Sequence, residues 1–228
     1  MQKNFIVTHK VFDRTPFKYM SNKTFLSDNN IPDTTNVTGL DSRIYGELPF
    51  WQYILSQMEF DDFASLHHYR RKMEFVQEQI CVPKPMAFGC SLADQMSAYH
   101  SPILVNAMSK ALNSDILYKT NVFIPYNMFC APKEVVENWV NFCFGVVDST
   151  MGILNLNGKT YEEILEFVKK NDSFTGKCAN KEKNLDPIYQ ARIGAFLLER
   201  ANSIFWMHVC PFNFIPCEVS LLEKGQKI

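Results

Sequence analysis

Short apolar runs alternate with longer segments of helical periodicity along this chain. The runs Phe5–Val7 and Phe63–Leu66 have the length of buried strands. Downstream of Pro49 and of Pro132, apolar residues recur at helical spacing, which gives each segment one apolar face. Because alternating strands and helices pack as layers around one core, the sequence predicts an α/β fold with a central sheet flanked by helices.

The size and charge of the chain favour one domain without a global attraction to polyanions. With 228 residues, of which 46% are hydrophobic, the chain is long enough to bury a core of its own. We expect a single domain over residues 1–228, with a mobile loop at the polar stretch 171–187. The formal net charge is −1, so a site for an anionic ligand must be local.

The cysteines and the first residues indicate a cytoplasmic protein. The seven Cys are odd in number and include no C-x-x-C pair, which favours reduced thiols. The start of the chain lacks the apolar core of a signal peptide, and no apolar run has the length of a transmembrane helix. The five His do not pair with Cys at the spacing of zinc ligands, so we expect no zinc site.

A basic cluster, His67-His68-Tyr69-Arg70-Arg71, follows directly after the apolar run Phe63–Leu66. In α/β proteins, ligands bind beyond the carboxyl ends of the strands. The planar fork of arginine pairs bidentately with phosphate and stays charged. The cluster therefore predicts a diphosphate-binding site; the alternative is a solvated helix start or a salt-bridged turn.

The His-Tyr-Arg-Arg element belongs to an ordered series of motifs that spans nearly the whole chain. The other members are Thr8-His9-Lys10, Thr38-Gly39, Glu47-Leu48 with Trp51, Tyr99-His100, Asn127-Met128-Phe129, Arg192, Gly194 and Glu199-Arg200. In this series the chain resembles the glycosyltransferase-like family of capsular-polysaccharide and O-antigen gene clusters. That family was long catalogued as a domain of unknown function and includes galactofuranosyltransferases. The chain departs from it at Ser42–Gly46, where the family usually carries a run with Asn and Cys.

The resemblance implies a GT-A type of fold, a single domain that binds a nucleoside-diphosphate sugar at the carboxyl edge of a mixed sheet. We expect the donor to be held by Thr8, His9, Lys10, His68, Tyr69, Arg70, Arg71, His100, Asn127 and Arg192. Three of these have structural alternatives: a solvated loop for Lys10, a buried structural imidazole for His100, and a turn residue for Asn127.

Most GT-A enzymes neutralise the leaving diphosphate with an Asp-x-Asp pair and a divalent metal. Here the comparable strand is followed by Arg70 and Arg71, which can supply the counter-charge instead. We therefore expect a metal-independent transferase whose co-substrate is the nucleotide sugar and which needs no cofactor. The competing metal pair, Asp61-Asp62, precedes the strand and so falls at its opposite edge.

Glu199 is the first candidate for the base that takes the acceptor proton. Arg192, Ala195 and Glu199 share one helix face, so a cation and a carboxylate lie about 10 Å apart among apolar neighbours. Burial of that carboxylate predicts a raised pKa, which suits proton transfer. The alternative is a structural ion pair with Arg192 or another basic neighbour. Glu47 is the second candidate, with an ordinary helix N-terminal acid as its alternative.

The expected activity is transfer of a hexosyl or pentosyl unit to a hydroxyl of a surface-polysaccharide intermediate. A second acceptor class is DNA that carries hydroxymethylcytosine, with Arg70–Lys72 and Lys177–Lys183 as its basic track. A third possibility is a non-catalytic accessory protein that binds nucleotides or glycans. Such a protein needs Arg70 and Arg71 but no base.

Overall fold

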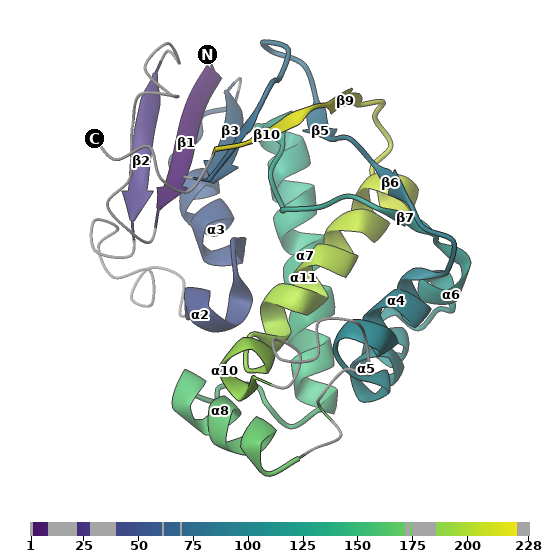
Figure 1. Cartoon of the computed structure of the whole chain (residues 1–228). Helices are drawn as coiled ribbons and strands as arrows, with labels where there is room; N and C mark the ends of the chain where they lie inside the picture. The colour runs from purple at the N-terminus through teal and green to yellow at the C-terminus, as the bar shows by residue number, and fades with distance from the viewer. Residues whose placement is uncertain are drawn as a thin grey trace.

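A mixed sheet forms one half of the molecule in this computed structural model, which describes residues 2–8, 22–27, 40–60, 62–68, 70–171, 174 and 186–222 (Figure 1). Within these residues eight strands form the main sheet: β1 (Gln2–Thr8), β2 (Lys23–Ser27), β3 (Phe63–His68), β4 (Arg71–Met73), β5 (Cys81–Pro83), β8 (Cys130–Pro132), β9 (Ile215–Cys217) and β10 (Val219–Leu221). A separate two-stranded sheet consists of β6 (Met86–Ala87) and β7 (Val122–Phe123).

The directions of the strands determine at which edge of the sheet the candidate site residues lie. β1 runs parallel to β2 and to β3, with Val7 opposite His68, so these strands end at one common edge. β8 runs antiparallel to β3, with Ser65 opposite Cys130, so β8 begins at that same edge. Residues just after β3 and just before β8 therefore meet there, although they are far apart in the sequence.

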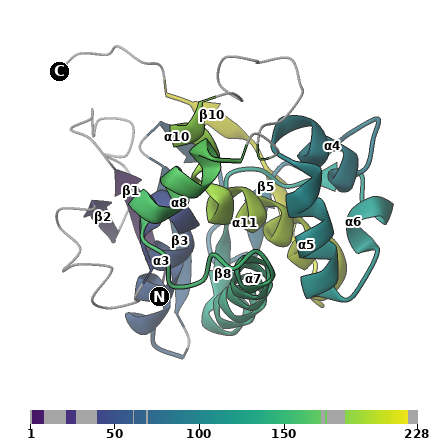
Figure 2. The ribbon, with the colours of Figure 1, turned by 90° about the horizontal axis from the view of Figure 1, so that it is seen from below.

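The helices cover the sheet and build the other half of the molecule. They are α2 (Ser42–Tyr45), α3 (Leu48–Ser56), α4 (Leu92–Tyr99), α5 (Pro102–Leu112), α6 (Ile116–Lys119), α7 (Lys133–Ile153), α8 (Tyr161–Lys169), α10 (Pro187–Gln190) and α11 (Ile193–Ile204), and α11 continues as the π-helix η3 (Phe205–Val209). The long α7 is central: Figure 2 looks along its axis, with β1, β2 and α3 on one side and α4, α5 and α6 on the other. The expected α/β architecture with a mixed sheet between helices is confirmed.

Local sequence patterns predicted most helix ends correctly. Pro102 begins α5, where Ser101 caps the helix. Thr160 and Glu163 form the capping box expected before α8. The helix expected from Tyr189 onward is interrupted, because α10 ends at Gln190 and α11 begins after Arg192. This break leaves Arg192 at the N-cap position, outside the regular helix.

Strand ends differ more from the sequence-based expectation. β3 continues past Leu66 as far as His68, and the single strand expected within 212–222 is two short strands, β9 and β10. In the region expected to be a loop, Pro187 already belongs to α10, and most of 171–187 lies outside the described residues. Among the described helices, none combines the length and the apolar character needed to cross a bilayer.

Candidate functional site

The basic cluster forms a tight hairpin rather than a free extension of the strand. His68 pairs with Arg71 across β3 and β4, and the Arg70 backbone N–H donates to His68 Nδ1 at 3.2 Å. His67 is fully buried, and that burial lowers the pKa of its imidazole to about 3. His67 is therefore a neutral structural residue at neutral pH. Arg71 is the first residue of β4 and lies at the carboxyl edge of β3.

Arg71 lies over the ring of Tyr126, with Cζ 4.3 Å from the ring centroid. Its Nε is buried and has no hydrogen-bond partner among the described residues. The turn that presents Tyr126 has an unusual backbone: Tyr126 and Asn127 have φ values of 76° and 50°, in the left-handed region. Such consecutive conformations persist only where surrounding contacts hold them, and they are frequent at functional sites.

Contacts from α3 and from its N-cap residue, Glu47, fix this turn. Trp51 Nε1 on α3 donates to the Asn127 carbonyl oxygen at 2.9 Å, and the Trp51 ring stacks on Phe129 at 3.8 Å. The Asn127 side chain donates from Nδ2 to Glu47 Oε2 at 2.9 Å. Asn127 Oδ1 is buried and accepts no hydrogen bond from the described residues. Asn127 therefore links the sheet edge to Glu47 and keeps one acceptor unused.

Glycines bring Glu47 close to α11. Gly46, with φ 60°, lies so near Ala195 that a Cβ at position 46 would be 3.1 Å from the Ala195 Cβ. A Cβ on Gly194 would be 2.9 Å from the backbone oxygen of Ile44. The backbones of α2 and α11 consequently approach each other more closely than larger residues would permit, and Glu47 lies beside α11.

Glu199 lies within electrostatic range of the same group. Burial raises the pKa of its carboxyl, Glu47 raises it further, and Arg200, Arg192 and Arg71 oppose the shift. This direction confirms the raised pKa expected from the sequence. Glu199 Oε2 pairs with Arg200 Nη1 at 3.2 Å, while a third of the Glu199 side chain stays exposed. The ion pair anticipated for Glu199 thus exists, and its partner is the adjacent residue Arg200.

Arg200 was not assigned to the site from the sequence. Its side chain is only 2% exposed, and it donates to the Phe196 carbonyl oxygen and to Gln95 Oε1 on α4. The available signal was a cation just after the apolar run 193–198, since a buried charge requires partners. The sequence around Gln95 gives no comparable signal, because its partner Arg200 lies 105 residues away in the chain.

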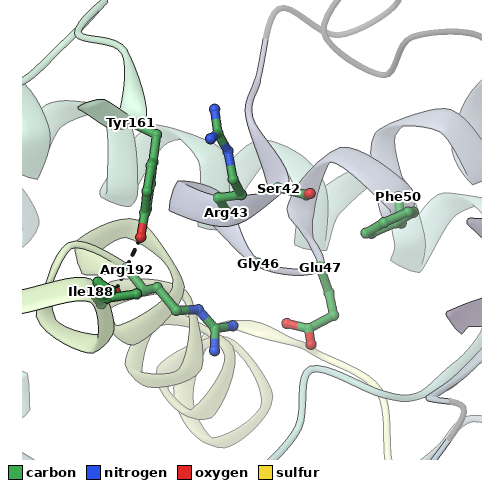
Figure 3. Close-up of a pocket in the computed structure, with 8 residues that line it drawn as sticks. All are labelled: Ser42, Arg43, Gly46, Glu47, Phe50, Tyr161, Ile188 and Arg192. Carbon is green, nitrogen blue, oxygen red and sulfur yellow. Dashed lines mark hydrogen bonds between the residues drawn. The ribbon is translucent and has the colours of Figure 1, made fainter. Parts of the chain in front are cut away.

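A cavity of about 240 Å³ opens beside Glu47. Glu47 and Arg192 point toward each other there, as Figure 3 shows. Its lining among the described residues is Ser42, Arg43, Gly46, Glu47, Phe50, Tyr161, Ile188 and Arg192. Glu47, which ranked second to Glu199 as a base in the sequence, is the carboxylate that faces this cavity.

Other candidates are placed differently. Thr8 ends β1 at the shared carboxyl edge, whereas His9, Lys10 and Tyr69 lie outside the described residues. His100 is 3% exposed and stacks on Phe196 at 3.7 Å, an arrangement typical of a structural residue.

The acid pair considered for a metal lies before β3. Asp62 forms an ion pair with Lys3 at 2.6 Å, and this hydrogen bond to Lys3 lowers the pKa of the Asp62 carboxyl. Asp61 lies outside the described residues. Within the part of the chain that the structure describes, no three His, Cys, Asp or Glu side chains come together as a metal site. Metal independence remains a prediction.

Comparison with known proteins adds a fold likeness. No family model matches the chain, and no curated protein matches it in sequence. A solved structure described as the apo form of the WbbM bifunctional glycosyltransferase superposes with a TM-score of 0.55 at 11% sequence identity. The match covers 97% of this chain and 45% of the other, so this chain spans a little under half the length of that protein. This likeness supports the GT-A-like fold.

Proposed function

We propose that this chain is a glycosyltransferase that moves a sugar from a nucleoside diphosphate to a hydroxyl of a glycan acceptor, without a divalent metal. One observation carries the proposal: Glu47, Arg71 and Arg192 each lie within electrostatic range of the Glu199 carboxyl. Group transfer from a diphosphate needs such a set, with carboxylates for the proton and guanidinium groups for the leaving charge. The fold likeness to a glycosyltransferase supports the same reaction class.

In the proposed reaction, the acceptor oxygen attacks the anomeric carbon of the donor sugar. The bond between that carbon and the diphosphate oxygen breaks, and the diphosphate leaves with the electron pair. The acceptor proton passes to a carboxylate, for which Glu199 is our first candidate because burial raises its pKa. Glu47 is the second candidate.

Arg71 is the proposed counter-charge for the leaving diphosphate, together with Arg70. The stacking on Tyr126 orients the Arg71 guanidinium, and the buried Nε has no described partner, so hydrogen-bonding capacity remains for a ligand. Asn127 and His68 lie at the same edge and are the proposed neutral contacts to the donor. The proposed acceptor class is a surface-polysaccharide intermediate.

The test is binding of nucleoside diphosphates to Arg70→Ala and Arg71→Ala variants. We expect at least one of them to weaken binding by about 1.5–3 kcal/mol, the scale of a charge-assisted hydrogen bond. Arg71→Lys should restore only part of the affinity, because an ammonium group lacks the bidentate fork. Titration calorimetry with UDP, GDP and the corresponding nucleosides separates phosphate binding from base binding.

Lys72→Ala is the matched control. Lys72 is a neighbouring cation, so its replacement by alanine changes the net charge as much as either arginine variant does. Its Nζ pairs with Glu74 at 3.1 Å. Binding of the diphosphates should be unchanged in this variant. If both arginine variants fold and bind the diphosphates as the wild type does, the hairpin is structural and the proposed function loses its physical basis.

A further inference from the structure

Contacts within the protein hold the residues that line the cavity beside Glu47. Arg43 is held by Asp41 Oδ2 at 2.6 Å and by Glu162 Oε1 at 2.8 Å, and its Cζ lies 4.5 Å from the centroid of the Tyr161 ring. The Tyr161 hydroxyl donates to the Ile188 carbonyl oxygen at 3.3 Å (Figure 3). These bonds join α2, α8 and α10, so the cavity has its shape before a ligand enters.

Arg192 is the guanidinium in this cavity that remains available to a ligand. Arg43 is already committed to two carboxylates. Arg192 is exposed and its guanidinium donates no hydrogen bond to a described residue, while Glu47 accepts only from Asn127 among them. Figure 3 shows the two side chains converging without an ion pair between them.

The described charged groups around the cavity sum to −1, because three carboxylates stand against two guanidinium groups. The charge of Arg192 cancels that of Glu47, and Asp41 and Glu162 more than offset that of Arg43. A hydroxyl group suits the chemistry of the facing pair, because it can donate to the carboxylate and accept from the guanidinium. A phosphate or carboxylate at this position would be attracted by Arg192 but repelled by Glu47, and it would add to the net negative charge of the described walls. The described walls therefore favour a neutral polyhydroxyl ligand over a polyanion.

The apolar part of the lining suits the same ligand. The ring of Tyr161 and the side chain of Ile188 provide apolar surface beside the polar pair. A sugar ring presents C–H groups on its faces and hydroxyls at its rim, so it matches a site with a few convergent polar groups on apolar walls.

We propose that this cavity is the acceptor subsite and that it binds an uncharged sugar unit of the acceptor glycan. This inference rests on the proposed function. It moves Arg192 from the donor, where the sequence analysis placed it, to the acceptor. It also places Glu47, the second candidate for the base, in the acceptor subsite and disfavours DNA as the acceptor.

Ligand-detected saturation-transfer NMR with the whole protein tests the proposal. The probes are methyl pyranosides of glucose, galactose, mannose and rhamnose at millimolar concentration, with methyl glucuronide and a single-stranded oligonucleotide as anionic probes. Arg192→Ala removes the cation, and Ile188→Trp narrows the cavity. Ile103→Trp is the matched control, because Ile103 is also surface-exposed and lies on α5, away from the cavity lining.

We expect at least one neutral glycoside to bind the wild type and the control. Its affinity should fall by about tenfold in Arg192→Ala, the effect of one lost charge-assisted hydrogen bond. A fall of about the same size is expected in Ile188→Trp, because the indole fills part of the cavity. The proposal is overturned if no neutral glycoside binds the wild type, if both variants bind like the wild type, or if an anionic probe competes at the same site.

Parallel binding of UDP and GDP distinguishes this failure from failure of the proposed function. If a diphosphate binds through Arg71 but no neutral glycoside binds, the acceptor inference is wrong and the transferase proposal stands. If no diphosphate binds either, the transferase proposal fails with it.

Discussion

Replacing Gly194 by alanine tests whether the close approach of α2 and α11 positions Glu47. The new Cβ would lie 2.9 Å from the Ile44 backbone oxygen and 3.1 Å from a ring carbon of Tyr45. Backbone cannot rotate away as a flexible side chain can, so α2 must shift. Such overpacking costs about 1–3 kcal/mol, and the better helix propensity of alanine returns up to about 1 kcal/mol. We expect a net loss of about 1–2 kcal/mol.

The assay is thermal and urea unfolding with a matched glycine variant. For a chain of this size, that loss corresponds to a Tm lower by about 2–8 °C. Gly145→Ala, on the exposed face of α7, introduces a Cβ with no atom within 4 Å. That control should raise the free energy of unfolding by about 0.5–1 kcal/mol, because alanine favours the helix.

The two substitutions should therefore change the free energy of unfolding in opposite directions. If Gly194→Ala is as stable as the wild type or more stable, α2 moves without cost and the close contact does not constrain Glu47. A second readout is the glycoside binding described above, which should weaken in Gly194→Ala and persist in Gly145→Ala.

Three further predictions concern catalysis, metal and pH. Glu199→Gln should lower the turnover of a nucleotide sugar by about 10²–10⁴ with donor binding retained, and unchanged turnover would assign the base to Glu47. The same activity should survive EDTA; loss on chelation with rescue by Mn²⁺ or Mg²⁺ would refute metal independence. His67 has a folded pKa of about 3 against about 6.5 when unfolded, so only the unfolded state gains its proton as pH falls. Its contribution to the free energy of unfolding should fall by about 2 kcal/mol from pH 7 to pH 5, and urea titrations of His67→Gln should lack that part of the loss.

Local sequence patterns predicted the elements that depend on neighbouring residues. The capping box of Thr160 and Glu163, the proline start of α5 and the apolar stripe of α7 are confirmed, because each depends on residues within one or two turns. Strand ends were predicted less well. The pairing of His68 with Arg71 depends on a hairpin whose register no local pattern sets.

The sequence also supplied most of the side chains that meet at the site, but not their arrangement. Glu47, Asn127, Arg71 and Glu199 were all candidates, and Asn127 donates to Glu47 across 80 residues of chain. Resemblance to a family marked these residues without showing that they touch. The antiparallel pairing of β8 with β3 brings Asn127 to the edge of the sheet where Arg71 lies. The close approach of Gly46 to α11 brings Glu47 beside the helix that carries Glu199.

The sequence by itself determined the α/β class, the helices and the residue types available for transfer chemistry, because spacing and composition act locally. Only the tertiary structure decided that the buried Arg200 donates to Gln95 on α4, that Tyr126 supports Arg71, and that Gly194 lets α2 approach α11. Each of these contacts joins or fixes backbone segments that the chain separates. Burial, cation–π contact and close backbone approach are three-dimensional conditions, so they arise only when those segments pack.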